Sequence, residues 1–587
     1  MRTSNSFRGL TSAILVASSR SFSSSAVTAV SSLSTLKLKR NNDSKSNTRR
    51  LHQTVDSAVI PGTSVAIPPE NLEAVDKLEP KSLWSQFAII SSIPRPSKQE
   101  EQVLAYIKAF AEERNLKWKQ DSVGNLVVFH PGCGVGKSAP AVILQGHVDM
   151  VTEKNGDTAH DFDKDPILLH QLPPFHNEQT NQKEQWLGAK GTTLGADNGI
   201  GVAATLALLE TPIDDETAVL PPLEALFTID EETGLTGATE LNAQELGLTG
   251  KSMLNLDTEE WGELYVGCSG GGESTITVPL SRGPTFVNDV EYMEIRVDGL
   301  LGGHSGINIH EGRGNAVLIC ASAAQKALQA APEGLSLVSI TGGDKHNAIP
   351  REARAVFAVS TTEAKHAIQA AAQLGNLVSK AEYGIVETKL NVVAKVATMD
   401  DNAEISPLDA KSASTLLSIL LALPHGPLKF SHSIPDLVET SNNIASIDMA
   451  SNDAEAIILC STRSSIGEAL EIARDKLEAI VSLGGAKIER GPPYPGWNPN
   501  MKSNLLSLGK KLVNRGTGKE PGVKAIHAGL ECGLLIEKMG GDVDALSFGP
   551  TITGAHSPDE RILCDTVPPF FELVKLMLEE LAKEPKA

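Results

Sequence analysis

The stretch Ile143-Leu-Gln-Gly-His147-Val-Asp149-Met150 decides how this chain folds. Apolar residues run directly into a histidine and an aspartate, which is the pattern of a buried strand that ends in polar side chains. Because residues two apart in a strand point to the same side, His147 and Asp149 are expected to lie together. An imidazole that binds a metal usually donates its second N–H to a carboxylate, and this pair has the spacing for that arrangement.

Short apolar segments of strand type flank this stretch and alternate with helical ones. The alternation predicts an α/β domain around a mixed central sheet. The predicted strands are Leu126 to His130, Ala141 to Leu144, Leu223 to Ile229 and Met253 to Leu256. The predicted helices are Gln102 to Glu113 and, after a glycine-rich loop, the buried segment within Thr193 to Glu210.

Acidic residues recur where these strands end, which is where α/β sheets place their ligand sites. Asp197 lies in a glycine-flanked loop before the buried helix, Asp230-Glu231-Glu232 follows one strand, and Asp257 ends another. Each cluster alone is more often a solvated turn. Their repeated position after apolar strands favours a metal site, in which consecutive acids can divide metal binding from proton transfer.

The order of these motifs resembles the aminoacyl-histidine dipeptidases, which belong to a larger dizinc family with carnosinases, aminoacylases and a glutamate-releasing carboxypeptidase. The resemblance runs from about Leu78 to the C-terminal region. It rests on His147-Val-Asp149, Thr192-Thr-Leu-Gly-Ala-Asp197-Asn-Gly-Ile-Gly201, Asp230-Glu-Glu232-Thr-Gly-Leu-Thr-Gly-Ala238, Leu254-Asn-Leu-Asp257-Thr-Glu-Glu260, Tyr265-Val-Gly-Cys-Ser-Gly-Gly271, Gly302-Gly-His304-Ser-Gly306, Lys345-His-Asn-Ala-Ile-Pro-Arg351, Ile526-His-Ala-Gly-Leu-Glu-Cys-Gly533 and Ser547-Phe-Gly-Pro-Thr-Ile-Thr-Gly-Ala-His556-Ser-Pro558.

The resemblance implies an aminopeptidase-type fold with two metal ions per subunit, held about 3.5–4 Å apart by a bridging carboxylate. Zn²⁺ is the implied metal, and Co²⁺ or Mn²⁺ suit the same nitrogen and oxygen ligands. Asp149 is implied to orient His147, and the peptide bond after Asp197 is expected to be cis. The implied ligands are Asp197 as the bridge, His147 and Asp257 for one ion, and Glu232 and His556 for the other.

Four further residues receive roles from the resemblance. Glu231 is the implied general base, which takes a proton from the attacking water and returns it to the leaving amine. His304 is the implied donor to the tetrahedral oxyanion. Arg463 stands where the family has an arginine for the substrate carboxylate, which a planar guanidinium binds at two points, although a surface salt bridge is the alternative. Asn347 is a second substrate-binding candidate. The implied reaction is hydrolysis of small dipeptides, with carnosine-like Xaa-His dipeptides as the best substrates.

The expected domain order has a lid inserted into the catalytic domain. Residues 1–77 are a transit peptide and linker, 78–272 and 490–587 the two parts of the catalytic domain, and 273–489 an α+β lid with helices at Ala316 to Ala331 and Ala364 to Ala381. The lid has about twice the expected length and two halves that echo faintly, at Asn347-Ala-Ile-Pro and Asn442-Asn-Ile-Ala. It is also the expected surface for a homodimer, and whether His304 acts in its own subunit stays open.

Composition excludes several classes of protein. The chain has 587 residues, of which 41% are hydrophobic and 21% charged, as in soluble proteins of more than one domain. Its net charge of -20 argues against a nucleic-acid partner. Without an apolar run of about 20 residues in the N-terminal stretch, no membrane anchor is expected there. Six cysteines without a C-x-x-C pair suit a reducing compartment.

The segment from Met1 to about Leu51 is rich in Ser, Thr, Arg and Lys and contains one acid, Asp43. This composition is typical of a transit peptide, and mitochondrial import is the favoured address. The alternatives are a plastid or cytosolic location and a Ser-rich tail that carries no address.

Two other functions remain open. The same metal site serves an aminoacylase or a carboxypeptidase that acts on N-acyl amino acids or short peptides. A non-catalytic binding protein of this fold is expected to have lost Glu231 or a metal ligand, and this chain keeps them all. His527 and Glu531 have the spacing of one helix face, but a packed structural role is favoured over a third metal site.

Overall fold

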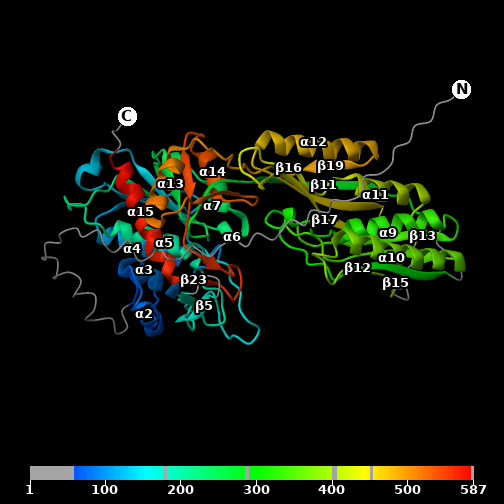
Figure 1. Ribbon diagram of the computed structural model, residues 1–587, viewed down its shortest axis with the longest axis horizontal. Helices are drawn as coiled ribbons and strands as arrows, with labels where there is room; N and C mark the ends of the chain where they lie inside the picture. Colours follow the sequence, from blue (N-terminus) through cyan, green and yellow to red (C-terminus); the bar gives the residue numbers. More distant parts are fainter. Residues whose placement is uncertain (1–58, 178–181, 284–289, 399–405, 450–453, 584–587) are drawn as a thin grey trace, which may run out of the picture.

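The computed structural model describes residues 59–177, 182–283, 290–398, 406–449 and 454–583. They form two bodies that lie side by side along the long axis, a catalytic body and a lid (Figure 1). The predicted transit peptide lies outside the described residues. Ile60 and Val75 are buried in the core of the catalytic body, which therefore begins before the predicted boundary at residue 78. Among the described helices, none has the length and apolar character needed to cross a bilayer.

The catalytic body is built on an eight-stranded mixed sheet in the order β1-β2-β8-β3-β9-β21-β10-β20. Its central strand β3 is parallel to both neighbours, so the carboxyl ends of three strands meet at one edge. The strands are β1 (Lys117–Gln120), β2 (Leu126–His130), β3 (Val142–His147), β8 (Leu223–Thr228), β9 (Ser252–Asn255), β10 (Glu263–Cys268), β20 (Gly522–Ile526) and β21 (Asp544–Ser547).

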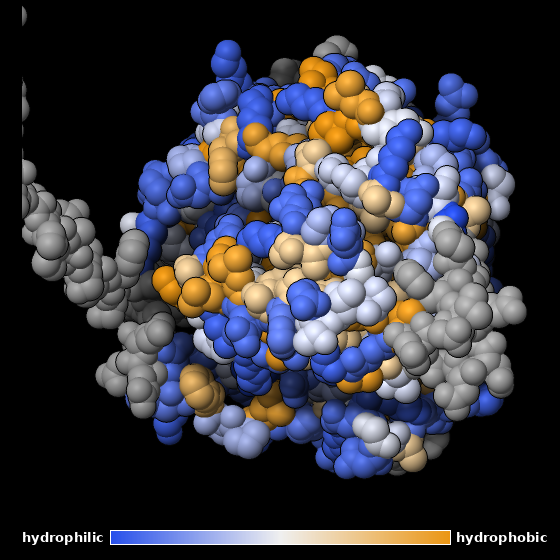
Figure 2. All heavy atoms as spheres, turned by 90° about the vertical axis from the view of Figure 1, so that its right-hand side faces the viewer, coloured by the Kyte–Doolittle hydropathy of each residue, from blue (hydrophilic) through white to orange (hydrophobic). Residues whose placement is uncertain are grey.

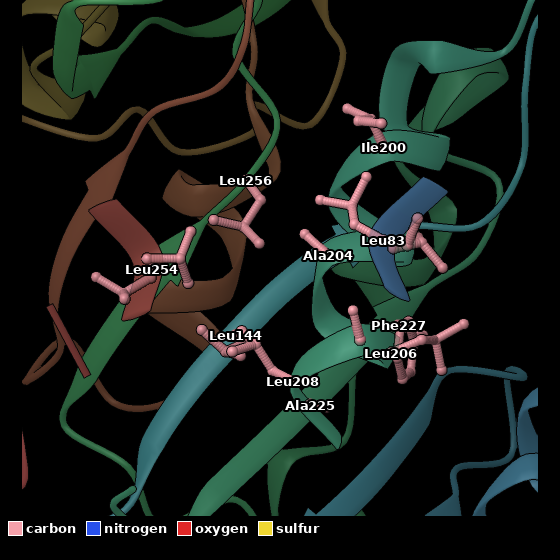
Figure 3. Packing of buried hydrophobic residues seen from close by; sticks show 14 of the residues in the cluster. Leu83, Leu144, Ile200, Ala204, Leu206, Leu208, Ala225, Phe227, Leu254 and Leu256 are labelled. Atoms are coloured by element: carbon pink, nitrogen blue, oxygen red, sulfur yellow. The ribbon is translucent and has the colours of Figure 1, made fainter. Parts of the chain in front are cut away.

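Helix α5 (Ala196–Leu209) packs against this sheet beside the strand ends. Every residue of β3 and β8 is buried, as is nearly all of α5. Because each buried leucine or phenylalanine contributes about 1.5–3 kcal/mol, this contact holds the start of α5 firmly in place. Figure 3 shows the residues that meet here: Ile200, Ala204, Leu206 and Leu208 of α5, Leu144 of β3, Ala225 and Phe227 of β8, and Leu254 of β9.

A small sheet joins the two parts of the catalytic body. Its order is β22-β23-β7-β4, so the C-terminal part pairs with residues that precede α5. A separate hairpin, β5 with β6, lies next to it in sequence. The strands are β4 (Leu169–Gln171), β5 (Phe175–Asn177), β6 (Gln182–Glu184), β7 (Trp186–Ala189), β22 (Ile552–Thr553) and β23 (Arg561–Leu563).

The other helices of the catalytic body surround the main sheet (Figure 1). They are α2 (Pro69–Val75), α3 (Lys81–Ser92), α4 (Glu101–Glu113), α6 (Glu231–Gly234), α7 (Thr236–Glu240), α8 (Ala243–Leu246), α13 (Asn504–Thr517), α14 (Glu531–Lys538) and α15 (Val567–Leu581), with short 3₁₀ turns at η2 (Gly134–Ser138) and η4 (Cys564–Thr566).

The lid contains a nine-stranded sheet made of two βαββαβ units. The strand order β15-β12-β14-β13 of the first unit is mirrored by β17-β18-β11-β19 of the second, and the two join between β13 and β17. Unit one is β12 (Glu291–Asp298), α9 (Ala316–Ala330), β13 (Leu335–Gly342), β14 (Ala353–Val359), α10 (Thr362–Tyr383) and β15 (Asn391–Val396). Unit two is β11 (Gly270–Pro279), α11 (Ala410–Ala422), β17 (Val438–Asp448), β18 (Glu455–Ser464), α12 (Gly467–Leu483) and β19 (Lys487–Arg490), with the extra strand β16 (Gly426–Phe430) beside β17.

The two halves of the lid are thus present, but they do not follow one another along the chain. Strand β11 precedes unit one, which is therefore inserted inside unit two. The sequence echo that we noted does not mark equivalent positions, because Asn347 lies between β13 and β14 whereas Asn442 lies within β17. The α/β class and the inserted lid are confirmed.

Candidate metal centre

The carboxyl end of β3 brings His147 against three carboxylates. Its Nε2 atom lies 3.1 Å from Asp197 Oδ1 and 3.3 Å from Asp257 Oδ1. On the other side of the ring, Nδ1 lies 3.3 Å from Asp149 Oδ1. One ring nitrogen therefore faces two candidate ligands, while the other faces the acid expected to orient the ring.

The second oxygen of Asp197 faces a second histidine. Asp197 Oδ2 lies 3.4 Å from His556 Nε2, and the same nitrogen lies 3.1 Å from Glu232 Oε2. Asp197 thus stands between the two histidines with one oxygen toward each. Its ligand atom, together with those of His147 and Glu232, falls within a 4.8 Å cluster. The peptide bond between Asp197 and Asn198 is cis, as expected.

The chemistry of this donor set fits divalent cations. Among the residues that the structure describes, buried Glu232 Oε1 accepts no hydrogen bond, and buried Asp257 Oδ1 has the 3.3 Å contact with His147 Nε2 but no hydrogen bond of normal geometry. A buried acceptor without a donor costs about 1–3 kcal/mol, and a cation bound at each of these oxygens would remove that cost. Burial raises the pKa of Asp257 to about 7, although His147 opposes the shift. Hydrogen bonds to Asp197 and Glu232 raise the pKa of His556 to about 11. Acidic oxygens gathered around imidazoles are a donor set that suits Zn²⁺, Co²⁺ or Mn²⁺.

Asp149 also positions the two consecutive glutamates. Its carboxylate accepts the backbone N–H of Glu231 at 3.1 Å and that of Glu232 at 3.2 Å. Its Oδ2 also accepts the Ser97 hydroxyl at 2.8 Å. Burial raises the pKa of Glu231 well above its usual range, although His147 opposes the shift. A carboxyl that holds its proton more tightly than usual is suited to exchange it with a reacting group near neutral pH.

Two residues outside the motifs hold the loop that carries Asp197. The Glu560 carboxylate accepts four consecutive backbone N–H groups, at distances of 2.7, 2.9, 2.8 and 3.3 Å from Leu194 to Asp197. Arg95 donates to the carbonyls of Val148 and Asp149, both at 2.9 Å, and to that of Gly195 at 2.6 Å. Gly195 has φ 67°, and a side chain there would lie 2.5 Å from Arg95 Nη2.

Arg95 and Glu560 tie the separate ligand segments together. Arg95 joins the end of β3 to the Asp197 loop. Glu560 lies in the same β22–β23 connection as His556. Its hydrogen bonds therefore tie the segment that carries His556 to the loop that carries Asp197. Sequence reasoning missed both residues, because a single arginine or glutamate beside a strand carries no spacing signal.

His304 lies on the lid, in the segment after β12. Its Nδ1 accepts the backbone N–H of Gly306 at 3.1 Å and of Ile307 at 3.0 Å. A nitrogen that accepts does not carry the proton, so these contacts assign it to Nε2. Burial lowers the pKa of His304 to about 4, with help from Arg463. The ring is therefore a neutral N–H donor at neutral pH, which is the group that a developing oxyanion needs.

Arg463 is buried on β18 beside the His304 segment. Its Nη1 donates to the Tyr494 hydroxyl at 2.9 Å, and its Nε lies 3.4 Å from Ser305 Oγ. In the part of the chain that the structure describes, no carboxylate lies within ion-pair distance of Arg463. Because Arg463 is buried, it does not form the surface salt bridge that was the alternative. A buried cation without an anionic partner is suited to bind an anionic ligand. Asn347 supports the same segment, since its carbonyl accepts Ser305 N–H at 2.7 Å.

His527 and Glu531 have packing roles. His527 Nε2 lies 2.7 Å from Ser441 Oγ of the lid, and Glu531 Oε2 accepts from Gln145 Nε2 at 2.6 Å and Thr228 Oγ1 at 2.7 Å. They do not share a helix face, because α14 begins at Glu531. The packed alternative therefore describes them better than a third metal site.

Comparison with known proteins places this geometry in context. A family model described as peptidase dimerisation domain matches residues 295–384, which lie in unit one of the lid. The cytosol non-specific dipeptidase of Escherichia coli (strain K12) is 38% identical over 514 residues, covering 87% of this chain and 99% of the relative. The crystal structure of the aminoacylhistidine dipeptidase from Vibrio alginolyticus matches with a TM-score of 0.74 and 36% identity, covering 87% of this chain and 99% of that one. A tripeptidase from Staphylococcus aureus shares the fold at a TM-score of 0.50 and 15% identity, covering 86% of this chain and 100% of that one.

Proposed function

This chain belongs to the M20 peptidase family, and from that premise we propose that it is a metal-dependent dipeptidase acting on Xaa-His dipeptides of the carnosine type. The observation that carries the proposal is Asp197, whose two oxygens lie 3.1 and 3.4 Å from two different histidines. A carboxylate in that position is suited to bridge two cations. The 38% identity to a dipeptidase and the 36% identity to an aminoacylhistidine dipeptidase support the substrate class.

Two Zn²⁺ ions are the proposed cofactors. His147 and Asp257 are assigned to one ion, Glu232 and His556 to the other, and Asp197 to both. When bound, the ions supply Lewis-acid activation of water and of the scissile carbonyl. Elemental analysis of the purified chain distinguishes zinc from cobalt and manganese.

The remaining side chains divide the proton transfer and charge stabilisation. Glu231 accepts a proton from the attacking water and delivers it to the leaving amine. Asp149 holds His147 in one orientation and the Glu231 backbone in place at the same time, since its Oδ1 atom contacts both the His147 ring and the Glu231 N–H. His304 donates from Nε2 to the oxyanion of the tetrahedral intermediate.

We infer that His304 serves the site of its own subunit. The His304 segment packs on its own catalytic body, because a side chain at Gly306 would lie 2.0 Å from the His527 carbonyl.

Arg463 is the residue that we propose selects substrates of dipeptide length. It captures the C-terminal carboxylate one residue beyond the scissile bond, and its pairing with the Tyr494 hydroxyl at 2.9 Å holds the guanidinium in one orientation. Asn347 is the second proposed substrate contact. The test is a panel of Xaa-His dipeptides, N-acyl amino acids and longer peptides, each with and without chelator. Preferential, chelator-sensitive cleavage of the dipeptides is expected; faster cleavage of N-acyl amino acids would assign an aminoacylase instead.

The proposals for cellular location and for assembly rest on the N-terminal composition and on the comparisons with known proteins. The composition of residues 1–51 supports mitochondrial import, while the relative from Escherichia coli is a cytosol dipeptidase. A fluorescent fusion of residues 1–77 tests the address, and a diffuse cytosolic signal would contradict import. The match to the peptidase dimerisation domain supports a homodimer through the lid.

A further inference from the structure

Helix α10 of the lid carries an apolar stripe that faces solvent. One side of the helix is buried against the lid, through Ala364, Ile368, Ala371, Ala372, Gly375 and Ser379. Beside it, the side chains of Leu374, Leu377 and Val378 are 46%, 69% and 43% exposed, and Ile385 just past the helix end is 98% exposed. The exposed residues Ala370 and Ala381 complete the row. This spacing is that of a helix face made for burial, and such exposed rows mark interaction sites.

Among the described residues, the other helices of the lid do not carry such a row. At the free end of the lid, apolar residues are interspersed with hydrophilic ones (Figure 2). On α12, Ile472 and Leu483 are 55% and 91% exposed but lie eleven positions apart along that helix. The α10 stripe is therefore a specific feature and not the general character of the lid surface.

The inner edge of unit one is already occupied. Strand β13 is paired with β17, and α9 packs on α11, so unit two of the same chain covers the edge that unit one would otherwise offer. A second copy must therefore bind elsewhere if residues 295–384 are to act as the peptidase dimerisation domain that they match. Helix α10 lies within that range and presents the unpaired apolar row.

The order of residues in the stripe fits a two-fold axis. If two copies of α10 pack antiparallel about the Leu377–Val378 pair, Leu374 of one copy faces Ala381 of the other. Ala370 in turn faces Ile385, so a large side chain meets a small one in both flanking pairs, while Leu377 faces Val378 at the centre. Beside the row, Gln373 faces Glu382, and no two like charges oppose one another. Large side chains against small ones let two helices approach closely, as ridge-into-groove packing requires.

We propose that two copies of this chain associate through their α10 stripes, in an antiparallel helix pair centred on Leu377 and Val378. This inference rests on the proposed homodimer and assigns its surface. The helical part of the stripe, from Ala370 to Ala381, spans about 17 Å, which is small for an interface, so the dimer is weak and concentration-dependent. Each subunit keeps a complete site, and separating the copies leaves turnover unchanged.

The experiment compares two substitutions of exposed leucines in the full chain. Leu377→Glu places a charge at the centre of the stripe in both copies, whereas Leu483→Glu makes the same change on α12. Sedimentation velocity over a hundredfold concentration range measures the dissociation constant, and circular dichroism melting checks that each variant folds. We expect Leu377→Glu to raise the dimer dissociation constant at least tenfold with unchanged kcat, and Leu483→Glu to leave both unchanged.

A cross-linking arm keeps the result interpretable if Leu377→Glu folds poorly. All six native cysteines are buried, so Leu377→Cys introduces an exposed thiol next to the proposed axis. Mild oxidation is expected to yield a covalent dimer with Leu377→Cys and none with Leu483→Cys. A wild type that stays monomeric overturns both the dimer and its surface. A wild-type dimer that neither substitution weakens, and that Leu377→Cys fails to trap, overturns the surface alone, while dipeptidase activity tests the proposed function separately.

Discussion

Replacing Glu560 with glutamine should loosen the loop that carries Asp197 while leaving every proposed metal-ligand side chain unchanged. One Glu560 oxygen accepts from Leu194 and Gly195 at 2.7 and 2.9 Å, and the other accepts from Ala196 and Asp197 at 2.8 and 3.3 Å. Glutamine keeps a single acceptor, so two of the four buried N–H groups lose their partner. At about 1–3 kcal/mol for each unsatisfied group, the loop loses about 2–6 kcal/mol of local stability.

The consequence should appear in metal affinity before it appears in global unfolding. The loop must be ordered to hold Asp197 between the cations, so part of the lost stability lowers metal affinity. The metal dissociation constant rises about tenfold for each 1.4 kcal/mol lost. Metal content after dialysis against metal buffers measures it. Glu572→Gln is the control, since it removes an acid whose 46% exposed side chain pairs with Lys575 on the surface. Wild-type metal affinity in Glu560→Gln would refute the reasoning.

Three further predictions concern single side chains. Glu231→Gln should lower kcat by about 10² to 10⁴ while both metals stay bound, and a parallel loss of metal would make Glu231 a ligand instead. Arg463→Ala should raise KM strongly for free dipeptides but little for C-terminally amidated ones, and Arg463→Lys should rescue poorly; equal losses on both substrates would rule out carboxylate recognition. Burial lowers the pKa of His527 to about 3. The unfolded chain therefore binds a proton below about pH 6.5 that the folded chain does not, and stability falls by about 1.4 kcal/mol per pH unit from there toward pH 3. His527→Gln should flatten that part of the unfolding free energy against pH, and an unchanged slope would show that His527 is not held neutral.

Much of the catalytic body was predictable because its strands and helices have a clear local pattern of apolar residues. The strand predicted at Leu126 to His130 is β2 with the same bounds, and the helix predicted at Gln102 to Glu113 is α4 within one residue. Likewise, polar residues at strand ends pointed to one edge of the sheet, where His147 and Asp257 do meet. Such features follow from the period of the hydrophobic pattern within a few residues.

The features that were missed depend on contacts between distant segments. Glu560 acts on residues more than 360 positions earlier, and nothing in its own neighbourhood reveals that. The nested order of the lid was hidden for the same reason, because β11 is separated from the rest of unit two by the whole of unit one. Sequence periodicity reports which face of an element is buried, but not which segment buries it.

The central claim is that the residues around Asp197 would hold two divalent cations on which dipeptide hydrolysis by this chain depends. The most direct measurement strips the purified chain with chelator and returns Zn²⁺ in known equivalents while following cleavage of a carnosine-type dipeptide. We predict loss of activity on stripping and full recovery at two equivalents per chain, with Asp197→Asn unable to recover. Full turnover by a chain that elemental analysis shows to be metal-free would contradict the account.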